Sequence, residues 1–116
     1  MKRLENHLIG IDEGEEVLFS DFEHNGPMWA GEGPRIARRV VTFSEPFLRP
    51  PSVQVGFSMW DISNAATARM DVRAEDITED QFRIAFRTWG DSKIARVRVN
   101  WRALGELEHA ENWQLY

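Results

Sequence analysis

Apolar residues alternate with small or polar ones in four stretches of the chain, at residues 52–59, 68–74, 82–87 and 95–101. Alternation at every second residue is typical of a β-strand with one face in a core and the other in solvent. The arginines of these stretches take the face opposite the apolar residues. The residues predicted to be buried are Ala68, Met70, Val72, Phe82, Ile84, Phe86, Val97, Val99 and Trp101.

Short segments with turn chemistry separate these predicted strands, at residues 61–64, 75–80 and 90–92. Their Asp, Asn, Ser and Gly residues favour tight turns, so neighbouring strands are expected to form antiparallel hairpins. Two further strands are predicted at 39–43 and 16–19, and the glycine- and proline-rich residues 23–34 are predicted to form an irregular loop. Six short strands predict an all-β sandwich, because a half-buried sheet needs a second sheet to cover its apolar face.

A chain of 116 residues is long enough for one domain with one core. We expect residues 15–105 to form a six-stranded antiparallel β-sandwich, residues 1–14 to form an N-terminal segment with a short helix or a trimer contact, and residues 106–116 to form an acidic C-terminal tail. No apolar window is long enough for a membrane span, and the first residues lack the apolar run of a secretory signal. The localisation is left open, with display on a bacterial or phage-like particle as one possibility.

The charged residues are distributed unevenly. A net charge of −5 argues against general DNA binding, which needs a basic surface. Twelve of the fourteen basic residues are arginine, and evenly spaced ones are predicted to line the outer face of a sheet: Arg69, Arg73, Arg83, Arg87, Arg96, Arg98 and Arg102. Like charges side by side need carboxylates, a polyanion or a neighbouring subunit between them. Cross-strand pairing with Asp71, Asp91 or the terminal acids is one hypothesis, and an oligomer interface is the other.

The sequence holds no recognisable catalytic or metal-binding motif. His7, His24 and His109 are far apart, and the absence of cysteine excludes thiol nucleophiles and disulfides. The acidic turn at 75–80 lacks the alternating oxygen ligands of a calcium loop. We therefore predict a protein that is not an enzyme, with no cofactor and no metal site.

Residues 38–105 carry a series of short motifs whose order and spacing are fairly specific. They are Val41-Thr42-Phe43-Ser44-Glu45-Pro46-Phe47, Arg49-Pro50-Pro51-Ser52-Val53, Trp60-Asp61, Ile77-Thr78 with Phe82, Thr88-Trp89-Gly90-Asp91-Ser92-Lys93-Ile94 and Val99-Asn100-Trp101. In this order the motifs resemble the H-type lectin domain, the carbohydrate-binding module of snail agglutinins and of the C-terminal part of slime-mould discoidins. The resemblance implies a six-stranded β-sandwich that assembles as a parallel trimer, with a shallow galactose or N-acetylgalactosamine site at each protomer junction.

The resemblance also implies which residues bind the sugar. The family's arginine falls on Arg69, its loop acid on Glu32 where snail lectins typically have aspartate, and its sugar-facing tryptophan on Trp89. The residue after that tryptophan is a histidine in the snail proteins and Gly90 here. The predicted carbohydrate-binding residues are therefore Arg69, Glu32, Trp89, Gly90 and Asp91. Trp60 and Trp101 are assigned to packing, and Trp29 is a candidate second stacking surface.

The function expected from this resemblance is a lectin that binds galactose or N-acetylgalactosamine-type glycans, or bacterial surface polysaccharide, in adhesion or cell-surface recognition. The expected assembly is a homotrimer or a hexamer, without nucleic acid and without membrane insertion. Two alternatives stay open at this point. One is a trimeric structural connector or adhesion-particle component with a degenerate sugar site, which Gly90 favours. The other is a protein that binds polyanionic capsule polysaccharide through its arginine-rich face.

Overall fold

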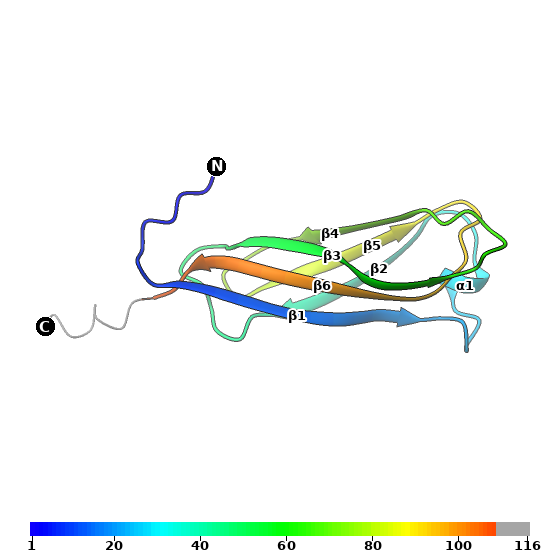
Figure 1. Cartoon of the computed structure of the whole chain (residues 1–116), viewed down its shortest axis with the longest axis horizontal. Helices are drawn as coiled ribbons and strands as arrows, with labels where there is room; N and C mark the ends of the chain where they lie inside the picture. Colours follow the sequence, from blue (N-terminus) through cyan, green and yellow to red (C-terminus); the bar gives the residue numbers. More distant parts are fainter. Residues whose placement is uncertain (109–116) are drawn as a thin grey trace, which may run out of the picture.

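In the computed structural model, which describes residues 1–108, two three-stranded antiparallel sheets pack face to face (Figure 1). The elements are β1 (Ile9–Ser20), α1 (Pro27–Ala30), β2 (Arg35–Thr42), β3 (Ser52–Ile62), β4 (Met70–Glu75), β5 (Gln81–Thr88) and β6 (Ile94–Glu106). Sheet A has the strand order β1-β6-β3, and sheet B has the order β2-β5-β4. The prediction of an all-β fold with six antiparallel strands is confirmed.

Strand β1 differs most from its prediction. It begins at Ile9, so the segment 1–14 that was expected to lie outside the sandwich supplies half of this edge strand, and residues 1–8 contain no helix. In a half-buried strand the apolar side chains face the core. In β1 the apolar residues Ile11 and Val17 are exposed instead, while Gly10 and Gly14 face inward. Backbone pairing with β6 along its whole length holds β1 in place, from Ile9 opposite Glu106 to Ser20 opposite Arg96.

A bulge explains why the inner face of β1 still reaches the core. The register between β1 and β6 shifts between Val17 and Phe19, and Leu18 and Phe19 both pack against the core cluster. The Phe19 ring lies 5.2 Å from the ring of Phe86, measured between centroids. One extra residue in an edge strand therefore places two consecutive apolar side chains on the buried side.

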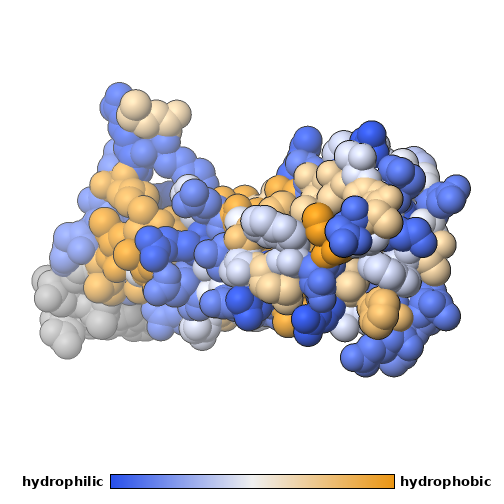
Figure 2. Space-filling model, turned by 45° about the vertical axis from the view of Figure 1, so that its right-hand side comes forward, coloured by the Kyte–Doolittle hydropathy of each residue, from blue (hydrophilic) through white to orange (hydrophobic). Residues whose placement is uncertain are grey.

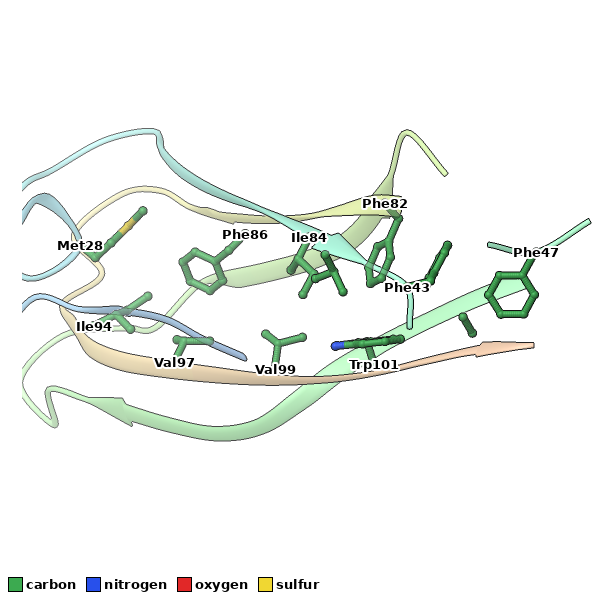
Figure 3. Packing of buried hydrophobic residues seen from close by; sticks show 12 residues of the cluster. Met28, Phe43, Phe47, Phe82, Ile84, Phe86, Ile94, Val97, Val99 and Trp101 are labelled. Atoms are coloured by element: carbon green, nitrogen blue, oxygen red, sulfur yellow. The ribbon is translucent and has the colours of Figure 1, made fainter. Parts of the chain in front are cut away.

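Aromatic rings dominate the middle of the core (Figure 3). The ring of Phe82 stacks on Phe43 at 5.6 Å and meets Trp101 edge-on at 5.5 Å. The indole of Trp101 also sets the identity of its neighbour on β1, because a Cβ atom at Gly14 would lie 2.9 Å from its Nε1 atom. The predicted core residues of β5 and β6 are thus confirmed as buried.

The N-terminal segment is attached to the far end of β6 through a buried glutamate. Glu106 accepts hydrogen bonds from the backbone N–H of Asn6 at 2.8 Å and from Nη1 of Arg49 at 3.0 Å. Leu107 N–H donates to the carbonyl of Leu8, and the ammonium group of Lys2 reaches two carbonyls of the proline loop. The boundary predicted before residue 106 therefore falls inside β6. Residues 109–116, the rest of the predicted acidic tail, lie outside the described residues.

No helical segment in residues 1–108 has the length and apolar character needed to cross a membrane.

Candidate functional site

One end of the sandwich brings together the loops that carry the predicted binding residues. Thr88, the last residue of β5, pairs with Arg35 at the start of β2 and with Met70 at the start of β4. Segments 31–34, 67–69 and 89–93 therefore meet at this end, close to α1 in Figure 1. Loops that converge at the end of a rigid sheet are a common location for binding residues.

Two buried hydroxyl groups fix the backbone on either side of Arg69. Ser92 accepts a hydrogen bond from the Arg69 N–H at 2.8 Å, and its own hydroxyl lies within 3.1 Å of the carbonyls of Thr67 and Trp89. Thr88 donates from Oγ1 to the carbonyl of Arg69 at 2.5 Å. Because Ser92 and Thr88 are almost fully buried, the Arg69 side chain projects from a backbone that cannot shift easily.

The guanidinium group of Arg69 lies across the turn at Gly90 and Asp91. Its Nη1 atom is 3.1 Å from Oδ1 of Asp91, and both side chains keep contact with solvent, at 41% and 67% exposure. Gly90 has a φ of +69°, and a Cβ atom there would lie 3.2 Å from the same Nη1 atom. A side chain at position 90 would therefore meet backbone strain and crowd the guanidinium group.

A second arginine holds the neighbouring loop. Arg35 donates hydrogen bonds to the carbonyls of Gly33, Pro27, Met28 and Gly90 at distances of 2.9 to 3.2 Å. The N–H of Gly33 also donates to the carbonyl of Gly90 at 2.9 Å. Glu32 precedes Gly33 and is exposed, and it makes no hydrogen bond or ion pair within residues 1–108. The backbone next to Glu32 therefore lies against the Gly90 turn, and the Glu32 side chain is exposed to solvent.

Among the described tryptophans, Trp89 offers an aromatic surface at this site. It follows β5 directly and its side chain is 45% exposed. Trp29 meets the ring of Phe22 edge-on at 4.9 Å and has the Lys93 ammonium 5.6 Å from its ring centroid, so its faces are partly covered. Trp101 is buried as predicted, but Trp60 is 54% exposed and its ring meets that of Phe57 edge-on at 6.2 Å, so its assignment mainly to packing was wrong. Trp60 lies on β3, an edge strand of sheet A.

The structure brings most of the predicted site together. Arg69, Gly90 and Asp91 are in direct contact, Trp89 adjoins them, and Glu32 lies one residue from the Gly33–Gly90 hydrogen bond. Sequence reasoning missed the supporting residues Arg35 and Ser92, because neither periodicity nor spacing distinguishes them. Within residues 1–108, no group of three His, Cys, Asp or Glu side chains is arranged to hold a metal ion.

The arginine-rich face predicted from the spacing is in fact divided between two sheets. Arg73, Arg83 and Arg87 lie on sheet B with Arg69 at its end, whereas Arg96, Arg98 and Arg102 lie on sheet A. Each of the seven has a carboxylate partner in the same chain: Arg69–Asp91, Arg73–Asp71, Arg83–Asp76, Arg87–Glu75, Arg96–Asp61, Arg98–Glu15 and Arg102–Glu13. Pairing within one protomer therefore gives each of these arginines a carboxylate partner, across two strands in four of the seven pairs.

Glu75 is the carboxylate that several arginines share. Its Oε1 atom accepts from Nη2 of Arg87 at 2.7 Å, and its Oε2 atom lies 3.8 Å from Nε of Arg38. The hydrogen bond from Arg87 lowers the pKa of Glu75 below its ordinary value, and the positive charges of Arg87, Arg38 and Arg83 lower this pKa further, against a smaller rise from burial. Charge neutralisation on sheet B thus depends on Glu75 being ionised.

We expect Glu75→Gln to lower the free energy of unfolding at pH 7, with a loss that begins to shrink below the ordinary glutamate pKa of about 4.3 and vanishes below the lower pKa of folded Glu75. A carboxyl group whose pKa is lower in the folded chain adds stability above its ordinary pKa, and this contribution is lost as the pH falls through the folded value. Urea unfolding at a series of pH values measures the difference. Glu79→Gln is the control, because Glu79 makes no ion pair within residues 1–108. A Glu75→Gln deficit that stays constant down to pH 3 would contradict the role of ionised Glu75.

Exposed apolar side chains lie toward the opposite end of sheet A. Ile11 of β1 is 62% exposed and stands opposite Leu104 of β6 on the outer face. Leu4, Leu8 and Ile9 are also partly exposed, and Figure 2 shows apolar surface gathered near the N-terminal segment. Isolated exposed apolar residues are ordinary in monomers, but a group of this kind is typical of a surface that contacts another molecule.

Comparison with known proteins shows which family and which solved structures this chain resembles. The H-type lectin domain family model matches residues 38–104. A protein of Fuscovulum blasticum described as "ATP synthase subunits region ORF 7" is 50% identical over 107 residues, which are 92% of this chain and 93% of that protein. Two solved structures of discoidin II from Dictyostelium discoideum match with TM-scores of 0.74 and 0.76 and sequence identities of 23% and 24%, over 94% and 91% of this chain. At this identity the likeness shows the fold alone, and the matched region spans 41% and 39% of those longer chains.

Proposed function

Because the chain belongs to the H-type lectin domain family, we propose that it binds glycans of the galactose or N-acetylgalactosamine type at the Arg69 turn. The observation that carries this proposal is the arrangement of Arg69 against Gly90 and Asp91, with Trp89 exposed beside them. A fixed guanidinium, an accessible carboxylate and an aromatic face are the groups that recognise the hydroxyls and the apolar face of a sugar ring.

Each side chain has a distinct role in this proposal. Arg69 donates hydrogen bonds to a ring hydroxyl or to the acetamide oxygen, because its guanidinium still has solvent contact beside Asp91. Glu32 accepts hydrogen bonds from neighbouring sugar hydroxyls, and Trp89 packs against the apolar face of the ring. Gly90 supplies no side-chain contact, so the site has one polar group fewer than the snail lectins. We expect this loss to change which sugars are preferred.

We further propose that the protein acts as a trimer in which two chains build each site. Support comes from the exposed apolar residues of sheet A and the N-terminal segment, with Ile11 and Leu104 side by side on the outer face. Burying this surface between protomers would add to the stability of the assembly. Several shallow sites in one trimer would give avidity that a single site lacks, which suits a role in adhesion or cell-surface recognition. A hexamer of two such trimers is compatible with the same surface.

We expect Arg69→Ala to weaken glycan binding by about tenfold to a hundredfold, because hydrogen bonds to a charged group contribute about 1.5–3 kcal/mol. A glycan array, followed by titration calorimetry with the best neutral ligand, measures the loss. The molar mass in solution, measured alongside, reports whether the assembly persists.

Arg73→Ala is the matched control for this test. It removes the same side chain from β4, where Arg73 pairs with Asp71 on the outer face of sheet B. Unchanged glycan binding in Arg69→Ala would refute the assignment of this residue to the site. Loss of both binding and assembly in Arg69→Ala, with Arg73→Ala intact, would show that Arg69 is structural.

A trimeric connector with a degenerate site is the second candidate, and Gly90 is the observation that favours it. The left-handed backbone at Gly90 would strain the histidine of the snail proteins at this position, and its Cβ atom, 3.2 Å from Nη1 of Arg69, would push the guanidinium group aside. A wild-type protein that assembles as a trimer and binds no glycan on the array would support the connector and contradict the lectin.

A further inference from the structure

A second cavity adjoins the proposed sugar site on the other side of Trp89. Its volume is about 340 Å³, and its walls are Pro34, Arg35, Ile36, Arg87, Thr88 and Trp89. Arg69 precedes β4, on one side of β5, whereas Pro34 and Ile36 belong to the β2 side. Trp89 follows β5, which lies between them, and it lines the cavity. The volume is within the range of small-molecule sites in proteins.

The walls of this cavity carry positive charge without a carboxylate among them. Arg35 directs its hydrogen bonds to four backbone carbonyls and forms no ion pair within residues 1–108. Arg87 shares its carboxylate, Glu75, with Arg38. The charge of these arginines is therefore only partly neutralised, unlike that of the paired arginines on sheet A.

Arg87 also has an unused donor. Its Nη1 atom is buried and has no hydrogen-bond partner among the described residues, while Nη2 donates to Glu75. Asp71, which stands directly opposite Arg87 in the register, is bonded to Arg73 instead. A covered donor without a partner is unfavourable, and an anion in the cavity would supply the missing acceptor after a small rotation of the side chain.

We propose that this cavity is a subsite for a carboxylated sugar residue, such as a uronic acid, within a glycan whose neutral residue occupies the Arg69 turn. The apolar face of the acidic sugar packs on Trp89 and Ile36, and its carboxylate faces Arg87 and Arg35. This proposal rests on the proposed lectin function and specifies the ligand class: acidic glycans of at least two residues. The proposal also differs from the hypothesis of a polyanion-binding arginine face. The other arginines of that face have carboxylate partners within the chain, so the proposed binding of acidic groups is confined to this cavity.

The test compares three disaccharides that differ at a single group. They are glucuronosyl-(1→3)-N-acetylgalactosamine, its methyl ester, and glucosyl-(1→3)-N-acetylgalactosamine, titrated into the full-length protein by calorimetry. We expect the uronate to bind about tenfold more tightly than the ester or the neutral disaccharide, because a charge-assisted hydrogen bond is present only in the uronate. The ratio should fall in about 1 M salt, where the Debye length is about 3 Å.

Two variants test the walls of the cavity. Arg87→Gln should reduce the uronate-to-ester ratio to about one, because the charged donor is lost. Ile36→Glu leaves the Arg87–Glu75 pair intact and should invert the ratio, because it places a carboxylate on the cavity wall. Arg73→Gln is the control, since it removes an arginine from the same face of sheet B without lining the cavity, and it should keep the wild-type ratio.

The outcomes separate this proposal from the lectin function itself. Equal binding of uronate, ester and neutral disaccharide would leave the lectin intact and overturn the acidic subsite. An Arg87→Gln protein that keeps the preference would likewise overturn it. A 6-sulfated glucosyl analogue that binds as tightly as the uronate would show a general anion site rather than a carboxylate subsite. Failure of the wild-type protein to bind any of these ligands, or any glycan on an array, would count against the lectin function.

Discussion

Phe82→Ala is expected to lower the free energy of unfolding by about 3–5 kcal/mol, which is typical for removing a buried phenylalanine ring. Phe82 is fully buried and lies between the rings of Phe43 and Trp101, at 5.6 and 5.5 Å. Its removal would leave a cavity that these rigid rings cannot fill without leaving their rotamers. A domain of this size has a total stability of about 5–15 kcal/mol, so the loss takes a large fraction of it.

Urea unfolding followed by circular dichroism measures this loss. The transition midpoint should fall while the slope with denaturant stays unchanged, because the folded state keeps its compactness. Phe22→Ala removes the same ring from a residue that is 56% exposed and contacts Trp29, so it should cost less than about 1 kcal/mol. Equal losses in the two variants would show that the aromatic cluster around Phe82 does not dominate the core.

The second large loss of stability is expected at the ion pair between Arg49 and the buried Glu106. Removing the exposed arginine is expected to cost more than removing the charge of the buried glutamate. The Glu106 side chain is 6% exposed, whereas that of its partner Arg49 is 65% exposed. Removing Arg49 leaves a buried carboxylate with a backbone N–H as its remaining partner, whereas removing the charge of Glu106 leaves an arginine that turns into solvent. We therefore expect Arg49→Leu to cost about 2–3 kcal/mol and Glu106→Gln to cost about 1 kcal/mol.

A double-mutant cycle separates these contributions. The double variant Arg49→Leu/Glu106→Gln should be more stable than Arg49→Leu alone, because the uncompensated charge has been removed. Hydrogen exchange of the Asn6 amide, which donates to Glu106 at 2.8 Å, would report whether the N-terminal segment stays attached. If the double variant were less stable than the wild type by the sum of the two single losses, the two side chains would be acting independently.

The alternation of apolar residues predicted the sandwich because β6, the central strand of sheet A, is regular where it faces the core. Val97, Val99 and Trp101 on β6 all point inward, and period-two patterning determines this directly. Strand β1 was mostly missed for a physical reason. It is an edge strand held by backbone hydrogen bonds to β6, and its inward positions carry Gly10, Asp12 and Gly14 rather than apolar residues. A strand held by backbone hydrogen bonds needs no alternation of apolar side chains, so its position could not be predicted from the sequence pattern.

Part of the candidate site could likewise be predicted from the sequence, and part could not. The resemblance of the Thr88–Ile94 motif to the lectin family marked Trp89, Gly90 and Asp91, and these do meet Arg69 at one turn. The side chains that hold this turn act on backbone carbonyls and amides, as Arg35 and Ser92 do. Such contacts depend on how loops approach one another in three dimensions, so neither residue type nor spacing predicts them. The spacing of the arginines predicts that they share the outer face of a strand. It does not predict which strands pair into one sheet, so the division of the arginines between two sheets was not predicted.

The four hydrogen bonds from Arg35 to backbone carbonyls have a consequence for the energetics of recognition. They join the first two residues of α1, Gly33 and the Gly90 turn into one unit in the folded chain. Most of the conformational entropy of these loops has therefore already been lost on folding, at a cost of roughly 1–2 kcal/mol per ordered residue. A glycan bound as proposed would therefore meet a preorganised surface, and the ordering of these loops would not reduce its affinity.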